Sequence, residues 1–228
     1  MFSHHYLINL GSNLQPNMFT RMKKLILSLL AAGAVCGAVA ADVTLPAPDT
    51  ERGLPLMQAM AQRRSVRSFA DRDLTDRDLS DLLWATVGQN RPDGKLTAPS
   101  CRDFREIRLF VFTRDGVGEY IPATHTIRHL VDGDHRALVA SGQAFAATAP
   151  VCLVMAADMT KFGNTDERSL MMAAVDVGIV SENASVACAG LGLATVPRAT
   201  MDAAAITSLL NLPATCLPIM NNPVGYPQ

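Results

Sequence analysis

The sequence predicts an α+β fold, because helical and strand patterns follow one another irregularly rather than in a strict alternation. The stretch 107–113 is rich in β-branched and aromatic residues and leads into Asp115-Gly116, which is typical of a hairpin turn. The stretch 167–189 is apolar nearly all round, as expected for a long central helix buried on every side. These two observations place strands and helices in one mixed domain.

The other elements are predicted from apolar spacing and capping residues. Pro55 opens a short helix. A second helix begins at Thr75, where Asp78 three residues later forms a variant of the capping box, and it ends at Gly88. The later elements are a helix at 136–147, a strand buried on both faces at 151–156, a helix at 202–210 and an extended segment at 217–226.

The composition indicates a single globular domain. The chain has 228 residues, of which 49% are hydrophobic and 18% charged, enough for a sizeable core without metal or disulfide support. A net charge of -1 gives no electrostatic reason to expect a nucleic-acid partner. Neither the cysteine nor the histidine spacing matches a metal-ligand pattern, so no metal site is predicted.

The first 40 residues are expected to direct export. Basic residues at 21–24 precede an apolar run at 25–35 and the small residues Ala38-Val39-Ala40, which is the pattern of a signal peptide. A membrane anchor is the alternative, but the apolar run is short for a span. We therefore predict an upstream extension and signal peptide at 1–40, a proline-containing linker at 41–53 and the functional domain at 54–228. The mature protein should be periplasmic, with no membrane span after cleavage.

Small residues along 167–189 would allow a second helix to approach closely, and in a short chain that helix can come from another copy. A symmetric homodimer is the economical interpretation. A central core helix in a monomer fits all-round burial equally well, so the sequence leaves this alternative open.

A basic motif, Arg63-Arg64-Ser65-Val66-Arg67-Ser68-Phe69, follows the first predicted helix. Guanidinium groups and a serine hydroxyl suit a phosphate, to which they can donate charge-assisted hydrogen bonds. Taken alone, the motif also fits a solvated basic helix end that complements the helix dipole.

Several segments in the same order resemble the FMN-dependent nitroreductase family, whose signature at this place is Arg-x-Ser-x-Arg/Lys-x-Phe. The resemblance extends from about residue 57 to 227 and includes the segments 79–85, 97–100, 149–151, 174–178, 190–195 and 223–227. It implies a nitroreductase-like FMN-binding fold, with a mixed central sheet surrounded by helices, in a homodimer with shared sites.

The resemblance also implies which residues bind FMN. Arg63, Arg64, Ser65 and Arg67 match positions that hold the phosphate and the pyrimidine edge of the flavin. Pro99 and Ser100 match a loop supplied by the partner subunit. Ala199 and Thr200 match a segment whose backbone N–H groups face flavin N5 and O4. The remaining expected cofactor-binding residue is Asp103.

Two departures from the family pattern concern this site. Asp103 and Arg105 occupy a loop where the family often has Asn and Gln, and a carboxylate lacks the donors of an amide. The chain also stops at Gln228, where many relatives continue to a basic residue that reaches the phosphate; Arg198 is a candidate substitute.

The resemblance implies an oxidoreductase in which hydride passes from NAD(P)H or another donor, through flavin N5, to a nitroaromatic or quinone-like acceptor. No catalytic side chain is named, because the chemistry takes place on the cofactor. Two alternatives remain: a flavin-binding module without turnover, and a family dehydrogenase that acts on another organic substrate.

Overall fold

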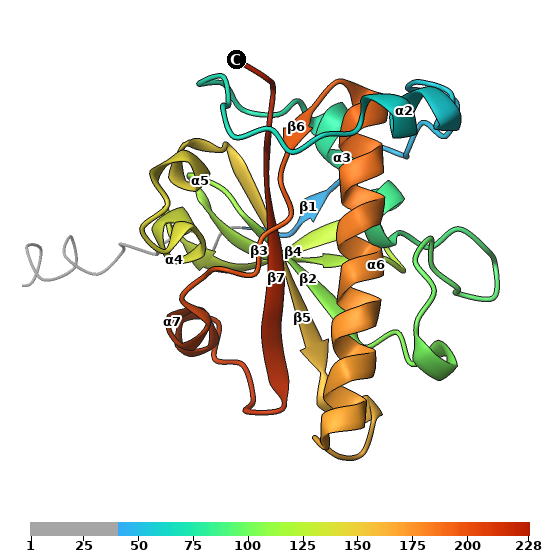
Figure 1. The fold of residues 1–228 in the computed structure, drawn as a ribbon, viewed down its shortest axis with the longest axis vertical. Helices are drawn as coiled ribbons and strands as arrows, with labels where there is room; N and C mark the ends of the chain where they lie inside the picture. Colours follow the sequence, from blue (N-terminus) through green and yellow to red (C-terminus); the bar gives the residue numbers. More distant parts are fainter. Residues whose placement is uncertain (1–40) are drawn as a thin grey trace, which may run out of the picture. The chain divides into compact units, whose positions relative to one another are not determined.

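The computed structural model describes residues 41–228 (Figure 1). The predicted upstream extension and signal peptide, residues 1–40, lie outside the described residues. In chain order the elements are β1 (Val43–Thr44), α2 (Leu56–Gln62), α3 (Asp76–Val87), η1 (Cys101–Asp103), β2 (Ile107–Phe112), β3 (Gly116–Ile121), β4 (Thr126–Asp132), α4 (Arg136–Ala140), α5 (Ala144–Thr148), β5 (Val151–Asp158), η2 (Met159–Lys161), α6 (Glu167–Leu191), β6 (Ala194–Thr195), α7 (Ala203–Leu209) and β7 (Cys216–Gly225).

Seven strands form one sheet in the order β1-β4-β3-β2-β5-β7-β6. Every neighbouring pair is antiparallel. The α+β class is confirmed, but the expectation of a mixed sheet is wrong for residues 41–228, because no parallel pair occurs there. The predicted hairpin joins β2 to β3, and the predicted buried strand is β5, which lies between β2 and β7.

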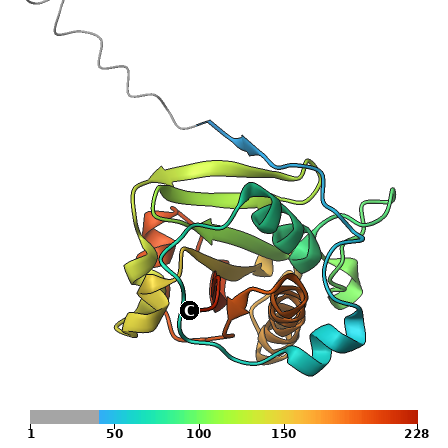
Figure 2. The same cartoon turned by 90° about the horizontal axis from the view of Figure 1, so that it is seen from above.

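Alternating side chains of the central strands build two cores on opposite faces of the sheet. Leu109 and Val111 of β2 belong to the core shared with α3 and α6. Phe110 and Phe112 of the same strand belong to the core shared with α4 and α7. Figure 2 shows α3 and α6 on one side of the sheet and α4, α5 and α7 on the other.

Capping residues end and begin the helices as the sequence predicts. Thr75 precedes α3 and its Oγ1 accepts a hydrogen bond from the Asp78 N–H over 3.1 Å. Gly88 ends α3. The predicted helix at 136–147 is wrong in one respect: it is two short helices, because Ser141 and Gly142 have positive φ angles of 46° and 81° that break the helical path.

Residues 41–53, expected as a linker, pack against the domain. Val43–Thr44 forms β1, which pairs with β4 at the edge of the sheet. The Arg52 guanidinium forms ion pairs with the buried carboxylates of Asp78 and Asp81 on α3. The Leu54 N–H donates to the Gly190 carbonyl over 3.0 Å. The segment therefore fixes the start of α2 against α3 and α6.

Helix α6 is the long helix that the sequence predicts, but within one chain it is not buried on every side. Ala173, Val177 and Val180 pack in the core, whereas Met171 and Val175 are 54% and 52% exposed. By length and composition α6 is the one described helix that qualifies as a membrane-span candidate. Its contacts with α2, α3 and β7 make it a core helix of this fold.

Candidate functional site

The basic motif lies beyond the end of α2, in extended backbone rather than on the helix. The Val66 N–H donates to the Thr195 carbonyl of β6 over 2.9 Å. Phe69 forms a β-bridge with Pro227, and the Ala70 N–H donates to the Tyr226 carbonyl over 2.9 Å. The motif is therefore tied to β6 and to the end of the chain, and the alternative of a basic final helical turn does not describe it.

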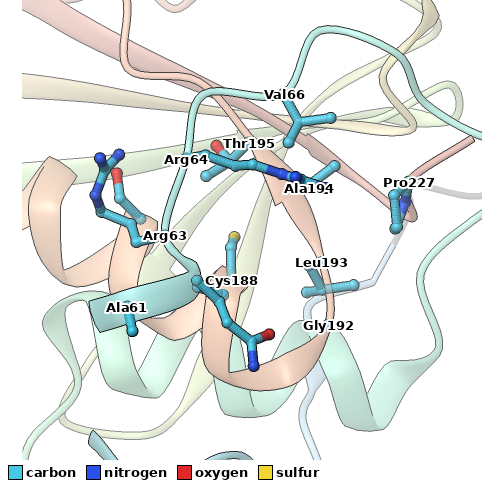
Figure 3. A pocket seen from close by; sticks show the side chains of 13 residues that line it. Ala61, Arg63, Arg64, Val66, Cys188, Gly192, Leu193, Ala194, Thr195 and Pro227 are labelled. Atoms are coloured by element: carbon cyan, nitrogen blue, oxygen red, sulfur yellow. The ribbon is translucent and has the colours of Figure 1, made fainter. Parts of the chain in front are cut away.

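A cavity of about 480 Å³ opens beside the motif (Figure 3). Its walls come from the end of α2, the C-terminal half of α6 and the turn into β6. In Figure 3 the Arg64 side chain extends across the cavity toward Ala194, whereas Arg63 points away from Leu193. The lining residues are Ala61, Gln62, Arg63, Arg64, Val66, Ser185, Cys188, Ala189, Gly192, Leu193, Ala194, Thr195 and Pro227. The volume is within the usual range for small-molecule sites.

The positive charge at this cavity is poorly neutralised. Within residues 41–228, no ion pair or hydrogen bond engages the side chains of Arg64, Ser65 or Arg67. Arg63 has one acidic neighbour, Glu182, with 3.8 Å between Nε and Oε1, and both side chains are substantially exposed. Such a surface pair stabilises little. The motif thus offers guanidinium groups and a hydroxyl to an anion from outside the chain.

A buried polar network supports the floor of the cavity. The Ser181 hydroxyl of α6 donates to Asn222 Oδ1 of β7 over 2.7 Å. Asn222 Nδ2 in turn donates to Thr195 Oγ1 of β6 over 3.3 Å. Thr195 then donates to the Pro223 carbonyl over 2.8 Å. Because these groups are buried and satisfied, they hold α6, β6 and β7 in one arrangement beneath the motif.

Cys188 lines the same cavity but is only 1% exposed. Burial raises the pKa of its thiol well above the ordinary range. The thiol is therefore protonated at neutral pH, which makes Cys188 a small packing residue of the cavity wall rather than a nucleophile.

The structure places Arg67 in a different cavity from Arg63 and Arg64. This second cavity measures about 720 Å³ and also contains Arg114 and Arg136. Both of those arginines form ion pairs, with Asp73 and with Asp134 respectively. Arg67 is the unpaired cation of this set within the described residues. The motif therefore presents cations to two separate cavities.

Pro99, Ser100 and Asp103 lie on the loop around η1, which packs against the N-terminal half of α6. The Cys101 N–H donates to Asp176 Oδ2 over 2.7 Å. Asp176 precedes Cys188 by twelve residues, or roughly 18 Å along a helix axis. A single chain therefore keeps this loop and the arginine cavity at opposite halves of α6.

The two unusual residues of this loop neutralise each other. Asp103 accepts hydrogen bonds from Arg105 Nε over 2.9 Å and from Nη2 over 2.6 Å. The Arg105 side chain lowers the pKa of Asp103 and keeps it ionised. Arg105 also donates to the Gly94 carbonyl over 2.8 Å. These side chains are thus committed to the loop itself, and neither replaces the amide groups that the family often has here.

Ala199 and Thr200 follow β6 on the surface. The Thr200 carbonyl accepts a hydrogen bond from Asn221 Nδ2 over 3.1 Å. The N–H groups of Ala199 and Thr200 have no acceptor within residues 41–228. These donors are therefore available to a ligand. This agrees with the expectation, from the family resemblance, that the N–H groups of this segment face the flavin.

The expectation that Arg198 serves the phosphate is wrong, because its donors are used inside the fold. Its side chain is 7% exposed and donates to the carbonyls of Val139 and Ala140, to Gln143 and to Asn221 Oδ1. The Nη1–Oδ1 distance to Asn221 is 2.8 Å. Arg198 therefore joins the end of α4 to β7 and has no free donor directed at the arginine cavity.

Sequence reasoning missed several residues around these cavities. Gly192 and Leu193 follow α6, and the sequence indicated only a turn there. Arg114 and Arg136 lie far from the motif in the sequence, and neither spacing nor composition places them beside Arg67.

Comparison with known proteins agrees with this fold and these motifs. The family model described as "Nitroreductase family" matches residues 60–226. A protein named as a nitroreductase in Methanocaldococcus jannaschii is 32% identical over 188 residues, which cover 78% of this chain and 93% of that protein. A Ralstonia eutropha structure named as a nitroreductase has a TM-score of 0.77 and 31% identity, and the match covers 84% of this chain and 92% of that one.

A more distant structure shares the fold alone. The NADPH:FMN oxidoreductase of Vibrio harveyi, complexed with NAD+, has a TM-score of 0.57 and 21% identity, over 76% of this chain and 69% of that one. The fold and the sequence together define an oxidoreductase enzyme. The chain belongs to the nitroreductase family.

The role of Arg198 can be tested by Arg198→Leu. This change leaves three buried acceptors without their donor, so the free energy of unfolding should fall by about 2–4 kcal/mol. Urea denaturation measures the loss. Arg91→Leu removes an exposed arginine from a turn and should change stability by less than about 0.5 kcal/mol. Equal effects of the two substitutions would refute the structural role of Arg198.

Proposed function

We propose that this enzyme binds FMN beside the basic motif and uses it to reduce an electron-poor organic acceptor. The observation that carries the proposal is the unneutralised motif, with Arg63 and Arg64 at one cavity and Arg67 at the other. Arg64 and Arg67 have no acidic partner among residues 41–228, and Arg63 has only the exposed pair with Glu182, so the motif keeps positive charge that an anion can neutralise. The phosphate of FMN is such an anion.

The donor set of this chain fits that cofactor. Arg63, Arg64 and the Ser65 hydroxyl would hold the phosphate through charge-assisted hydrogen bonds. The free N–H groups of Ala199 and Thr200 would donate to the polar edge of the ring system. Arg67 would stabilise the negative charge that reduction places on the pyrimidine edge. Bound FMN supplies hydride transfer between the donor and the acceptor.

The exposed apolar surface supports a homodimer. Leu56, Met57 and Met60 of α2 are 67%, 77% and 50% exposed. On the N-terminal half of α6, Met171 and Val175 are more than half exposed. In each copy, α2 packs on the C-terminal half of its own α6. A two-fold axis that crosses α6 would place this α2 over the N-terminal half of α6 in the other copy. Both patches would then be covered.

The same two-fold operation would complete the site. It brings the η1 loop of one copy, anchored at Asp176, toward the arginine cavity of the other, near Cys188. Pro99 and Ser100 would then line a site whose motif belongs to the partner. Each copy would contribute to both sites, which explains why one chain alone separates the predicted residues.

The physiological donor and acceptor are proposed by class. NAD(P)H is the donor that we propose for the purified enzyme, and a nitroaromatic or quinone-like molecule is the acceptor. With the signal peptide predicted at 1–40, we propose a periplasmic location, where the donor in the cell can differ from a nicotinamide. A flavin-binding module without turnover and a dehydrogenase of another substrate are the competing functions.

The absorption spectrum of the purified protein, followed by a donor screen, tests the proposal. We expect bound flavin that is bleached by NADH or NADPH under anaerobic conditions and restored by a nitroaromatic or a quinone. Bound flavin that no donor reduces would favour the module without turnover. Reoxidation by neither acceptor class would favour a dehydrogenase. A colourless protein that takes up no added FMN would overturn the proposal.

Substitution of the motif tests the site. The double variant Arg63→Ala with Ser65→Ala should weaken FMN binding by about 2–4 kcal/mol, because it removes charge-assisted hydrogen bonds to the phosphate. Fluorescence titration with FMN measures the change. Arg91→Ala, which also removes one exposed arginine, is the matched control and should bind FMN as the unaltered enzyme does. Equal FMN affinities for all three proteins would show that FMN does not bind at the motif.

The dimer can be tested by Val175→Arg on the exposed face of α6. A guanidinium placed without a partner in an apolar interface should weaken association by about 3–5 kcal/mol. Sedimentation velocity should then show a monomer where the unaltered protein is a dimer. Ala204→Arg adds the same charge to the exposed face of α7 and should leave the dimer intact. A dimer that survives Val175→Arg contradicts this interface.

A further inference from the structure

Glu106 is a buried acid whose carboxyl receives no hydrogen bond from another described residue. It lies immediately before β2 and is 1% exposed. Neither of its carboxyl oxygens has a hydrogen-bond partner among the described residues. Its backbone is fixed, because the Glu106 carbonyl accepts from the Asp158 N–H over 2.9 Å. An ionised carboxylate in such a place would lose its hydration without compensation.

The neighbour of this side chain is a second buried acid. The Asp176 side chain on α6 is 5% exposed, and its hydrogen bond and its charge are among the causes that raise the pKa of Glu106. Asp176 Oδ2 accepts from the Cys101 N–H over 2.7 Å. Among the described residues, this N–H is the one hydrogen-bond donor to the Asp176 carboxyl. Their geometry is satisfied when one proton lies between them, with Glu106 as donor and Asp176 as acceptor.

Asp176 is also the anchor of the η1 loop. Three residues of this loop, Arg102, Asp103 and Arg105, have positive φ angles of 51°, 59° and 51° although none is glycine. Such backbone persists only where surrounding contacts hold it. The Cys101–Asp176 hydrogen bond is the one hydrogen bond between the loop and α6 in the part of the chain that the structure describes.

We propose that Glu106 and Asp176 share one proton and that this pair positions the loop 99–105, so that the loop is held at acidic pH and loosened as the pH rises toward neutrality. Glu106 and Asp176 are positioning residues that act through the Cys101 N–H. Since the loop reaches the flavin of the partner only if the proposed function holds, the effect on FMN binding rests on that function. The effect on the loop does not.

The pKa direction agrees with the geometry. Burial, and then the hydrogen bond and charge of Asp176, raise the pKa of Glu106 to about 7 from its ordinary value of 4.5, although a hydrogen bond with its own backbone N–H opposes the shift. A carboxyl whose pKa is raised by folding stabilises the held position of the loop 99–105. This stabilisation is fully present when the pH is below the pKa of the carboxyl in the unfolded chain. That contribution falls as the pH rises from about 4.5 to about 7 and is absent above.

Other ionisable groups on the surrounding elements do not pair with Glu106. Arg105 of the loop binds Asp103, Arg108 of β2 binds Glu119, and Asp158 at the end of β5 accepts from Thr160. The remaining cations on these elements are exposed at the surface: Arg102 on the loop, Lys161 on η2 and Arg168 on α6. Asp176 is thus the charged group that faces Glu106.

Hydrogen exchange of the Cys101 amide tests the proposal. The measurement uses the protein without the predicted signal peptide. The comparison is the exchange rate of the unaltered protein divided by that of Glu106→Gln at each pH, a ratio that cancels the intrinsic pH dependence of exchange. Glutamine keeps a neutral donor toward Asp176 at every pH. We expect a ratio near one at pH 4.5 and at least tenfold by pH 8.

A ratio that is constant across this pH range would overturn the proposal, because a merely structural role of Glu106 would change exchange equally at all pH values. If Glu106→Gln does not fold, the carboxyl titration of Glu106 in the unaltered protein, followed by carbon NMR, decides the matter. A midpoint near 7 supports the shared proton. A carboxyl already ionised at pH 5 overturns it.

The consequence for the cofactor has its own readout. If both proposals hold, the Kd for FMN of the unaltered protein should rise from pH 5 to pH 8. This rise should be at least several-fold larger than the rise in Glu106→Gln. Exchange that follows the expected pH dependence in a protein that binds no FMN would refute the proposed function and leave the loop anchor intact. Normal FMN binding with a pH-independent exchange ratio would support the proposed function and refute the shared proton as the loop anchor.

Discussion

The constraint on which the structure depends is the burial of α6 against one face of an antiparallel sheet. Leu109, Val111, Leu153 and Met155 face this helix, and the intervening residues of the same strands face α4 and α7. Because the strand period is two, the register of β2 and β5 decides which residues meet α6. The elements that carry the candidate site are then placed by their contacts with this helix: α2 at its C-terminal half, the η1 loop at Asp176.

Charge pairing separates the scaffold from the site. Arg52, Arg108, Arg136 and Arg198 each have a carboxylate, amide or carbonyl acceptor within this chain. They fasten the N-terminal segment, the sheet and the α4–α5 region. The motif arginines follow the opposite pattern, since Arg64 and Arg67 lack such acceptors among the described residues. Arginines whose donors are satisfied internally cannot serve a ligand, and this physical distinction removes Arg198 from consideration.

Much of the fold could be predicted from the sequence, because its signals are local. Pro55, Thr75 and Gly88 mark helix ends through the chemistry of capping. The sequence failed where distant contacts decide the outcome. Residues 41–53 look like a linker by composition, but their packing depends on Asp78 and Asp81. The break at Ser141 was missed because a non-glycine residue with positive φ leaves no compositional mark.

The candidate site was predicted in part. Arg63 and Arg64 lie together at a cavity, as the motif indicates. The position of Arg67 at a second cavity was not predictable, because the side chains of an extended segment depend on which neighbours bind its backbone. Glu106 escaped notice for a similar reason: its burial follows from the packing of the η1 loop and α6, and neither is visible in the residues beside it.

The length of α6 has a consequence for how the proposed dimer would work. In that dimer, one continuous helix of 25 residues would form the wall of one proposed site and, farther along its length, would hold the loop that completes the other. A rigid-body shift of this helix would be felt in both sites at once. Reduction of the first flavin could then alter the affinity or the rate at the second, a mechanical link that two independent sites would lack.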